Sequence, residues 1–351
     1  RKEISENIVV YRCPLWVPSK QSGINRILHL LSFLLSSTPV LLSHLFWNPD
    51  VILAIAPTII TAPNVLFFFF FFKCKTWLHI QDFELDVALD LELLPISKWN
   101  FPLARKTEAF IIRCFDMVSS ISDQMVKKII LKGVPEEKVK MHPNWIDTEN
   151  IYPLHNDNPF RNELNIPDDQ IVVLYSGNMG KKQGLEILPE TARELQGFSN
   201  VMIILGGDGV VREDLEKQAK DLRNIHFMPL QPRERLNDLL NLADIHILPQ
   251  RADAADLVMP SKLSGMLASG KPVIATAEKD TELGKVVAKV GKLVPPEKPK
   301  LLAEAIIQLA KDEEQRVKLG MRGRDYAQEH WGKEKVLNRW MEEMEKLVDV
   351  R

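Results

Sequence analysis

The sequence predicts a protein of the α/β class with two domains. Its 351 residues are more than one hydrophobic core usually serves. Short runs rich in β-branched residues alternate with helical segments along most of the chain, which is typical of parallel sheets covered by helices. Glycine-rich turns follow several of these runs in the C-terminal half, and ligands of such sheets bind at the carboxyl ends of the strands.

The N-terminal third holds two apolar stretches, residues 27–47 and 51–72, that contain no Asp, Glu, Lys or Arg. Each stretch is long enough to span a bilayer. Prolines argue against a span, because Pro39 divides the first stretch into two helical segments and Pro57 ends a buried strand in the second. We expect the helices to be buried or to lie against a membrane surface, with a span as the disfavoured alternative.

The second stretch predicts a strand, a short helix and a further strand. The helix covers 65–72, takes Asn64 as its N-cap and contains six consecutive phenylalanines. The strand after it, TWLHIQDFE, ends in polar side chains, so the three elements form a βαβ unit. A strand over 116–122 then leads into Ser122, which caps a helix that ends at Gly133.

The C-terminal half predicts a second α/β block. Residues 155–170 are polar and carry prolines, which indicates a linker into this domain. Helical segments separate the expected strands, and the tail is helical and amphipathic, so we expect a parallel sheet covered on both faces. The strands are expected at IVVLYSG, VMIILGG, NIHFMPL, DIHILPQ and KPVIATA.

Composition narrows the function classes. The formal net charge is -2 with 26% charged residues, and a general nucleic-acid binder would carry a basic excess. The three cysteines are too few and too scattered for a disulfide framework or a zinc site, so we expect reduced thiols. Charged residues interrupt the first twenty positions, which therefore do not resemble a signal peptide.

Three strand ends of the C-terminal block offer the chemistry of an anion site. SGNMGKKQG (176–184) joins glycines to two lysines, GGDG (206–209) permits close approach of a ligand, and 256–262 opens a helix whose first turn carries a lysine. A lysine there is unfavourable for the helix, which indicates a role with a ligand. Ordinary turns and solvated lysines are the alternative. The candidate binding residues are Gly177, Asn178, Gly180, Lys181, Lys182, Gly207, Asp208, Asp256, Leu257, Val258, Met259, Ser261 and Lys262.

The N-terminal half offers a second polar strand end. WLHIQDFELD places His79, Asp82, Glu84 and Asp86 together, and His79 and Asp82 are our candidate catalytic residues. The carboxylates also suit a metal ion. No histidine stands at ligand spacing and no Asp-x-Asp pair occurs in the chain, so we expect no metal and no cofactor.

The segments NMGKKQGLE, ILGGDG, PNWIDT and DLVMPSKLSGMLASGKPVIAT resemble family 4 glycosyltransferases. Together with WLHIQDFELD and VSSIS they are similar to the colanic-acid and exopolysaccharide type of bacterial enzyme. The likeness covers roughly residues 8–345, and the run 256–276 is its most specific part.

The resemblance implies a GT-B fold, in which two Rossmann-like domains face a cleft. We expect residues 1–153 to form the acceptor-side domain, with the helix of 330–351 packed back on it, and 154–329 to bind the nucleotide sugar. The resemblance also implies retention of configuration, no essential metal, a position for His79 near the reacting sugar, and donor binding by the candidate residues of the C-terminal block.

The sequence departs from the family pattern at three places. The chain begins after the usual first strand and glycine-rich loop, so we expect the N-terminal sheet to lack its first strand. The position of the ribose-binding glutamate is Gly265, and a hydrogen bond to the hydroxyl, worth ~1.5–3 kcal/mol, would have to come from elsewhere. The usual Arg and Lys of the phosphate loop are Asn178 and Gln183.

We therefore hypothesise a metal-independent, retaining glycosyltransferase of the hexosyltransferase type. Its partners would be a nucleotide-diphospho-sugar and a glycan or lipid-linked saccharide, with no nucleic acid. The apolar N-terminal helices and the lysines of KCK (73–75) favour a cytoplasmic protein held peripherally on the membrane. The alternatives are a sugar-nucleotide epimerase or hydrolase, and a non-catalytic homologue that acts as a binding or scaffold protein.

Overall fold

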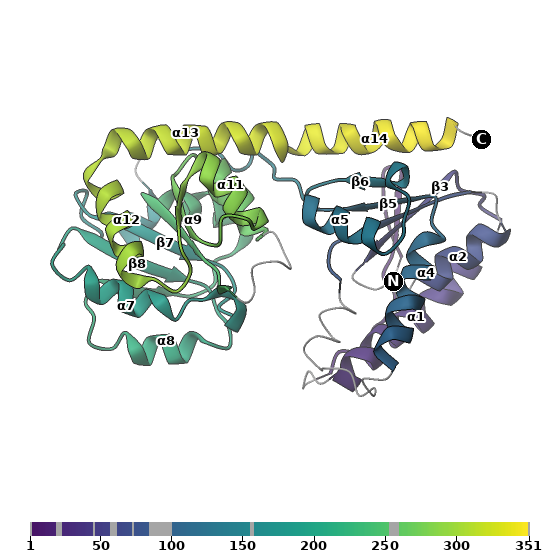
Figure 1. Ribbon diagram of the computed structural model, residues 1–351, viewed down its shortest axis with the longest axis horizontal. Helices are drawn as coiled ribbons and strands as arrows, with labels where there is room; N and C mark the ends of the chain where they lie inside the picture. The colour runs from purple at the N-terminus through teal and green to yellow at the C-terminus, as the bar shows by residue number, and fades with distance from the viewer. Residues whose placement is uncertain are drawn as a thin grey trace. The chain divides into compact units, whose positions relative to one another are not determined.

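The chain folds into two compact units (Figure 1). The computed structural model describes residues 2–18, 23–44, 46–56, 62–71, 74–83, 100–154, 158–252 and 260–349. Unit 1 contains Arg1–His142 and Trp340–Arg351, and unit 2 contains Pro143–Arg339. The sequence predicted the two boundaries at 153/154 and 329/330.

Unit 2 is built on a parallel sheet of six strands in the order β12-β11-β10-β7-β8-β9. The chain winds outward in one direction from β7 and in the other from β10, so the topological switch point lies between these two strands. The strands are β7 (Ile171–Ser176), β8 (Val201–Gly206), β9 (Ile225–Met228), β10 (Ile245–Pro249), β11 (Val273–Thr276) and β12 (Lys292–Val294).

Helices cover both faces of this sheet, as the sequence predicts. Apolar side chains of α7, α8 and α12 pack on one face. Those of α6 and α9 pack on the other face beside those of α10, α11 and α13. The helices are α6 (Pro159–Glu163), α7 (Ile187–Glu194), α8 (Arg212–Gln218), α9 (Leu236–Leu242), α10 (Lys262–Ala268), α11 (Glu282–Val290), α12 (Pro299–Lys311) and α13 (Glu313–His330).

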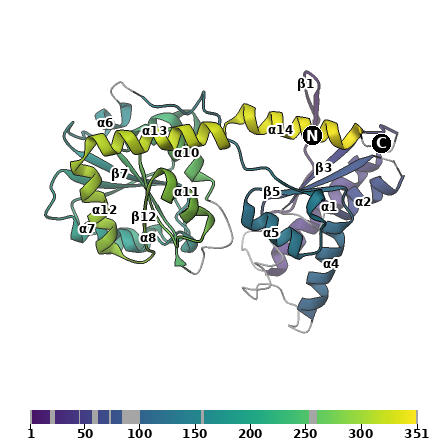
Figure 2. The ribbon, with the colours of Figure 1, turned by 45° about the horizontal axis from the view of Figure 1, so that its top comes forward.

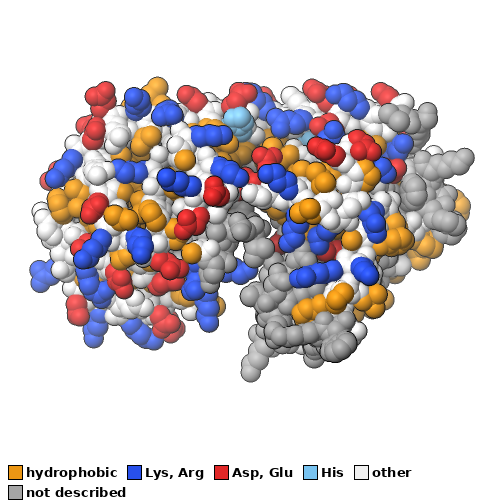
Figure 3. All heavy atoms as spheres, viewed as in Figure 1, with side chains coloured by type: hydrophobic (Ala, Val, Ile, Leu, Met, Phe, Trp, Pro, Cys, Tyr) orange, Lys and Arg blue, Asp and Glu red, His pale blue; other side chains and the backbone are white. Residues whose placement is uncertain are grey.

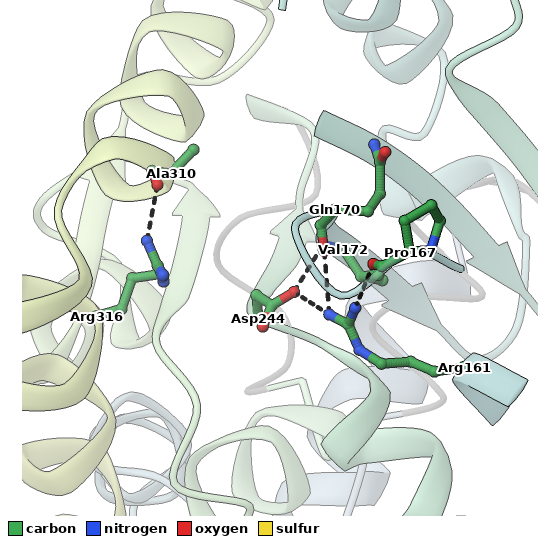
Figure 4. A network of polar contacts seen from close by, with 7 residues as sticks. All are labelled: Arg161, Pro167, Gln170, Val172, Asp244, Ala310 and Arg316. Carbon is green, nitrogen blue, oxygen red and sulfur yellow. Dashed lines mark hydrogen bonds and ion pairs between the residues drawn. The ribbon is translucent and has the colours of Figure 1, made fainter. Parts of the chain in front are cut away.

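Protein groups satisfy one another at the amino edge of this sheet (Figure 4). Asp244, just before β10, accepts hydrogen bonds from the Val172 amide (2.8 Å) and from the guanidinium of Arg161 (2.6 Å). Arg161 also donates to the carbonyls of Pro167 and Gln170, and Arg316 donates to the carbonyl of Ala310. The contacts of Arg161 and Asp244 tie the start of the sheet to the segment before it, and the contact of Arg316 joins α13 to α12.

Unit 1 holds a parallel sheet of four strands in the order β3-β4-β5-β6. A β1–β2 hairpin, which the sequence did not predict, extends from the unit (Figure 2). The helix α14 (Lys333–Asp349) begins in unit 2 and joins unit 1 from Trp340 onward. The other elements are β1 (Lys2–Ser5), β2 (Ile8–Tyr11), α1 (Gly23–Leu42), β3 (Val51–Ala56), α2 (Ala62–Phe71), β4 (Lys75–Ile80), α4 (Phe101–Arg113), β5 (Met117–Ser120), α5 (Asp123–Leu131) and β6 (Val139–Met141).

Two details predicted for the apolar helices were wrong. The helix α1 continues through Pro39, which costs it one backbone hydrogen bond, and the Thr38 hydroxyl bonds the Leu34 carbonyl in the turn before it. The helix α2 begins at Ala62, so Asn64 lies inside it instead of capping it. The Asn64 amide donates to Thr38 Oγ1 (3.0 Å) and so joins the two helices.

The apolar helices of unit 1 do not form a membrane span in the described part of the chain. Among the described residues, no helix combines the length and the apolarity needed to cross a bilayer. Of the six phenylalanines, the side chain of Phe67 is described and is 46% exposed, and the other five lie outside the described side chains.

The predicted Ser122 cap of α5 is confirmed, since its hydroxyl accepts from the Met125 amide, and Gly133 adopts a φ of 88° at the helix end.

Candidate functional site

The loops after β7 and β8 lie against each other at the carboxyl edge of the unit 2 sheet. The Gly177 amide donates to the Gly206 carbonyl (2.9 Å), and the Met179 amide donates to the Asp208 carbonyl (2.8 Å). A Cβ atom on Gly207 would lie 2.0 Å from the Gly177 carbonyl oxygen, and Gly207 has a φ of 135°. Only glycine fits at position 207. Its lack of a side chain lets the loops after β7 and β8, both predicted as binding loops, come into contact.

Lys262, in the first turn of α10, reaches the same point. Its Nζ lies 2.9 Å from where a Cβ atom on Gly177 would stand. The ammonium donates to the Tyr175 hydroxyl (2.5 Å) and lies 4.2 Å from the centroid of that ring. The Tyr175 hydroxyl in turn donates to the Asn178 carbonyl (2.6 Å). Burial lowers the pKa of Lys262 to about 8 and raises the pKa of Tyr175.

The loop after β7 also carries three exposed polar residues. Lys181 and Lys182 are exposed in a single 3-10 turn, and Asn178 is exposed beside them. The turn ends at Gly184, which has a φ of 64° and packs on the backbone of Gln250 and Arg251. The loop therefore touches the end of β10 across the topological switch point.

The other two predicted strand ends are partly described. Asp208 is exposed, and its carboxylate accepts from the Gly209 amide (2.7 Å), so it does not cap α8. Ser261 is exposed just before α10 and makes no capping hydrogen bond through its side chain. The predicted binding residues Asp256, Leu257, Val258 and Met259 lie outside the described residues.

In unit 1, His79 is buried within a polar cluster. It is 4% exposed in β4. Its Nδ1 lies 2.9 Å from the Ser119 hydroxyl, which also accepts from Trp77 Nε1 (2.8 Å), and its Nε2 lies 2.7 Å from Gln81 Nε2. Burial lowers the pKa of His79 to about 4, with a smaller contribution from His142. The imidazole is therefore neutral at pH 7. Asp82, two residues past the strand, is half-buried.

Two residues of α14 complete this cluster. The Trp340 ring stacks on His142 (centroids 4.2 Å apart) and meets His79 edge-on (5.0 Å). The carboxylate oxygen Oε2 of Glu343 lies 2.9 Å from Nε2 of His142, which is fully buried. The end of the chain thus fixes the surroundings of His79 within unit 1.

The family described as "Glycosyl transferases group 1" matches residues 156–326. The chain is 37% identical over 344 residues to WcaI of Escherichia coli strain K12, named as a glycosyl transferase of colanic acid biosynthesis, and the match covers 95% of this chain and 83% of that protein. This chain belongs to the group 1 glycosyl transferases.

Solved structures show the fold of this glycosyl transferase. Sucrose-phosphate synthase from Thermosynechococcus elongatus has a TM-score of 0.76 at 18% identity, covering 99% of this chain and 86% of that one. HepE of Anabaena, solved in complex with UDP-glucose, has a TM-score of 0.69 at 17% identity, covering 92% of this chain and 84% of that one. The predicted GT-B fold, with two Rossmann-like domains, is confirmed.

Two residues that contact the carboxyl edge of the sheet, Tyr175 and Arg212, were not predicted from the sequence. Tyr175 holds Lys262, and Arg212 donates to the carbonyls of Gly207 (2.5 Å) and Met228 (3.3 Å). A tyrosine one position before the end of an apolar strand was the available signal for Tyr175. Among the described residues, no group of three or more His, Cys, Asp or Glu side chains could hold a metal ion.

Proposed function

We propose that this chain transfers a hexosyl group from a nucleotide-diphospho-sugar to a glycan or lipid-linked saccharide, with retention of configuration, in exopolysaccharide biosynthesis. Membership of the family supports glycosyl transfer. The name of WcaI supports the pathway class, and the UDP-glucose in the HepE structure supports the donor class. The observation that carries the proposal is Lys262, a half-buried cation at the carboxyl edge of a parallel sheet.

The mechanism rests on stabilising the diphosphate as it leaves. Glycosyl transfer builds oxocarbenium character on the sugar and negative charge on the leaving group together. Lys262, Lys181 and Lys182 would supply positive charge, and Gly180 would allow backbone to approach the phosphates. No metal ion is needed in this scheme. On unit 1, His79 would act as a neutral positioning group, and Asp82 would orient it or the acceptor.

Sugar transfer and donor hydrolysis by variants test this proposal. A thermal-shift panel of UDP-glucose, UDP, GDP and ADP first identifies the nucleotide, since a ligand of the folded state raises the melting temperature. Lys262→Ala should then lose at least tenfold in kcat/KM, whereas Lys318→Ala, which removes an exposed lysine of α13, should not. Rates of the Lys262→Ala and His79→Ala variants near that of the parent protein would refute these assignments. Binding without turnover would indicate the non-catalytic alternative.

We also propose that unit 1 docks on a membrane surface, where a lipid-linked acceptor would lie. The helix α1 exposes an apolar stripe that includes Leu28, Leu31 and Leu35, the last of them 71% exposed. Phe46 and Trp47, past its end, are 99% and 72% exposed, and aromatic residues favour the membrane interface. A cavity of about 930 Å³ with a mostly apolar lining lies beside them, between α1, β3 and the hairpin.

Vesicle flotation tests the docking. Leu35→Ser with Trp47→Ser should weaken binding to vesicles of phosphatidylethanolamine and phosphatidylglycerol, and Leu131→Ser, which changes an 86% exposed leucine of α5, should not. Equal binding by all three proteins would refute the docking surface. On the face shown in Figure 3, basic and acidic side chains are interspersed, so the described part of that face offers no basic patch for a polyanion.

A further inference from the structure

Gln250 carries a buried amide oxygen that no described residue hydrogen-bonds. It follows β10 directly and is 8% exposed, and its Oε1 finds no donor within the part of the chain that the structure describes. Its main chain is fixed, since its amide donates to Thr276 Oγ1 (3.1 Å) and its carbonyl accepts from the same hydroxyl (3.3 Å). The backbone is therefore held while the side-chain acceptor is left unpaired.

The side chain of Gln250 lies on the face of the sheet that α10 covers. Side chains alternate along a strand, so Gln250 shares a face with Leu248 and His246. Leu248 belongs to the apolar cluster of Leu263 and Met266 on α10, and His246 Nε2 lies 3.2 Å from the hydroxyl of Ser269 at the end of that helix.

The register places Gln250 beside the first turn of α10. From His246 to Gln250 the strand advances about 13 Å. The helix, running back from Ser269 to Lys262, covers about 10 Å. Gln250 thus lies next to the turn that holds Lys262, on the β10 side of the switch point, and the loop that carries Lys181 and Lys182 packs on its backbone.

Asp244 and Gln250, which flank β10 at its two ends, differ in how their side-chain oxygens are satisfied. At the amino edge, the side chain of Asp244 accepts from an amide and from a guanidinium (Figure 4). At the carboxyl edge, the amide oxygen of Gln250 is buried and finds no donor among the described residues, which is unfavourable. A ligand that brings a donor would remove this cost.

We propose that Gln250 Oε1 accepts a hydrogen bond from a hydroxyl of the bound nucleotide sugar. This inference rests on the proposed function. A carbonyl oxygen of an amide only accepts, and an ionised diphosphate offers only acceptors, so the two do not match. Lys262 holds the diphosphate, and Gln250 reads a sugar hydroxyl beside it. Gly265, one turn further along α10, contributes no polar side chain.

Calorimetric titration of the full chain tests the proposal. The probes are UDP, GDP, ADP, their 2′-deoxy and 3′-deoxy forms, and UDP-glucose. If the hydroxyl is on the ribose, the parent protein should bind the preferred diphosphate at least tenfold more tightly than a deoxy form, and Gln250→Met should abolish this difference. If the hydroxyl is on the transferred sugar, Gln250→Met should bind UDP normally and lose at least tenfold for UDP-glucose.

Two further variants separate recognition from a structural role. Gln250→Glu keeps an acceptor in place and should retain the discrimination, and Gln170→Met makes the same change at the amino edge and should alter no affinity. Removing an unpaired acceptor should leave the melting temperature of Gln250→Met equal or higher. The proposal is overturned if Gln250→Met binds every probe as the parent does, or if it melts well below the parent. If the parent binds none of the probes, the proposed function fails instead.

Discussion

The ammonium of Lys262 and the hydroxyl of Tyr175 lie 2.5 Å apart, with the ammonium also held over the tyrosine ring. The pair joins the start of α10 to the end of β7, at the switch point of the sheet. The side chain is thereby ordered before any ligand arrives, which reduces the entropy lost on binding. The low pKa of Lys262, about 8, makes the pair sensitive to mildly alkaline pH.

Binding of the nucleoside diphosphate should weaken above pH 8. Lys262 is charged below this pH and loses its proton as the pH rises through 8, so affinity should fall by up to tenfold per unit between pH 8 and 9.5. Titration calorimetry between pH 7 and 9.5, where the diphosphate stays ionised, measures the profile. Lys262→Met should flatten it and Lys318→Met should not. A profile that keeps its slope in Lys262→Met would assign the titration to another group.

The low pKa of Lys262 also makes stability depend on pH, and stability should rise with pH where nucleotide affinity falls. Because burial penalises the charged lysine, the cost is fully present below pH 8 and disappears as the pH rises from about 8 toward the ordinary value of 10.5. The contribution of Lys262 to the free energy of unfolding therefore increases over that range. Urea unfolding measures this at pH 7.5 and 9.5. The free energy of unfolding of the parent, relative to that of Lys262→Met, should be higher at pH 9.5 than at pH 7.5.

Gly207→Ala should disrupt the junction of the two loops. The new Cβ would stand 2.0 Å from the Gly177 carbonyl oxygen, at a φ of 135° that L-residues rarely adopt. We expect a loss of several kcal/mol in stability, or a displaced loop and a loss of nucleotide binding. Gly197→Ala is the matched control, since no atom lies within 4 Å of its Cβ position. Similar melting and affinity in both variants would show that the junction tolerates a side chain.

His79 should remain neutral through the physiological range. Its pKa of about 4 lies below the ordinary 6.5, so the folded state binds fewer protons than the unfolded state between these values. Its contribution to stability is present above pH 6.5 and is lost as the pH falls toward 4. Imidazole signals followed by NMR and assigned with His79→Asn should show no titration of this ring between pH 5.5 and 8. A midpoint near 6.5 would mean that the ring is not buried in solution.

The sequence was sufficient to predict which strand ends lie together in unit 2. Strand ends of a parallel sheet meet at one edge, so the glycines after β7 and β8 and the lysine of α10 could be placed together without a structure. The Pro39 prediction failed for a tertiary reason: contacts such as the Asn64–Thr38 bond between α1 and α2 stabilise a helix that propensity alone would break.

Other features depend on pairs that are distant in the chain. Tyr175 and Lys262 are 87 positions apart, and His142 and Glu343 are 201 apart. Nothing in the residues near His79 indicates that Trp340 covers it. The lack of a donor for Gln250 Oε1 among the described residues is likewise a property of the folded chain, which no local sequence pattern indicates.

Trp340 should anchor the last part of α14 to unit 1. Its ring contacts Trp77, His79 and His142 at centroid distances of 4.2 to 5.0 Å. Trp340→Ala should cost roughly 3 kcal/mol of local stability, the lower end for a tryptophan because the side chain is half-buried. By hydrogen exchange, amides of α14 after Trp340 should then open on the order of 100-fold more often. Met341→Ala, which truncates a 58% exposed neighbour, should change exchange by no more than about twofold. Equal acceleration in both variants would mean that Trp340 contributes only helix propensity, and that the stacking with His142 does not hold the helix.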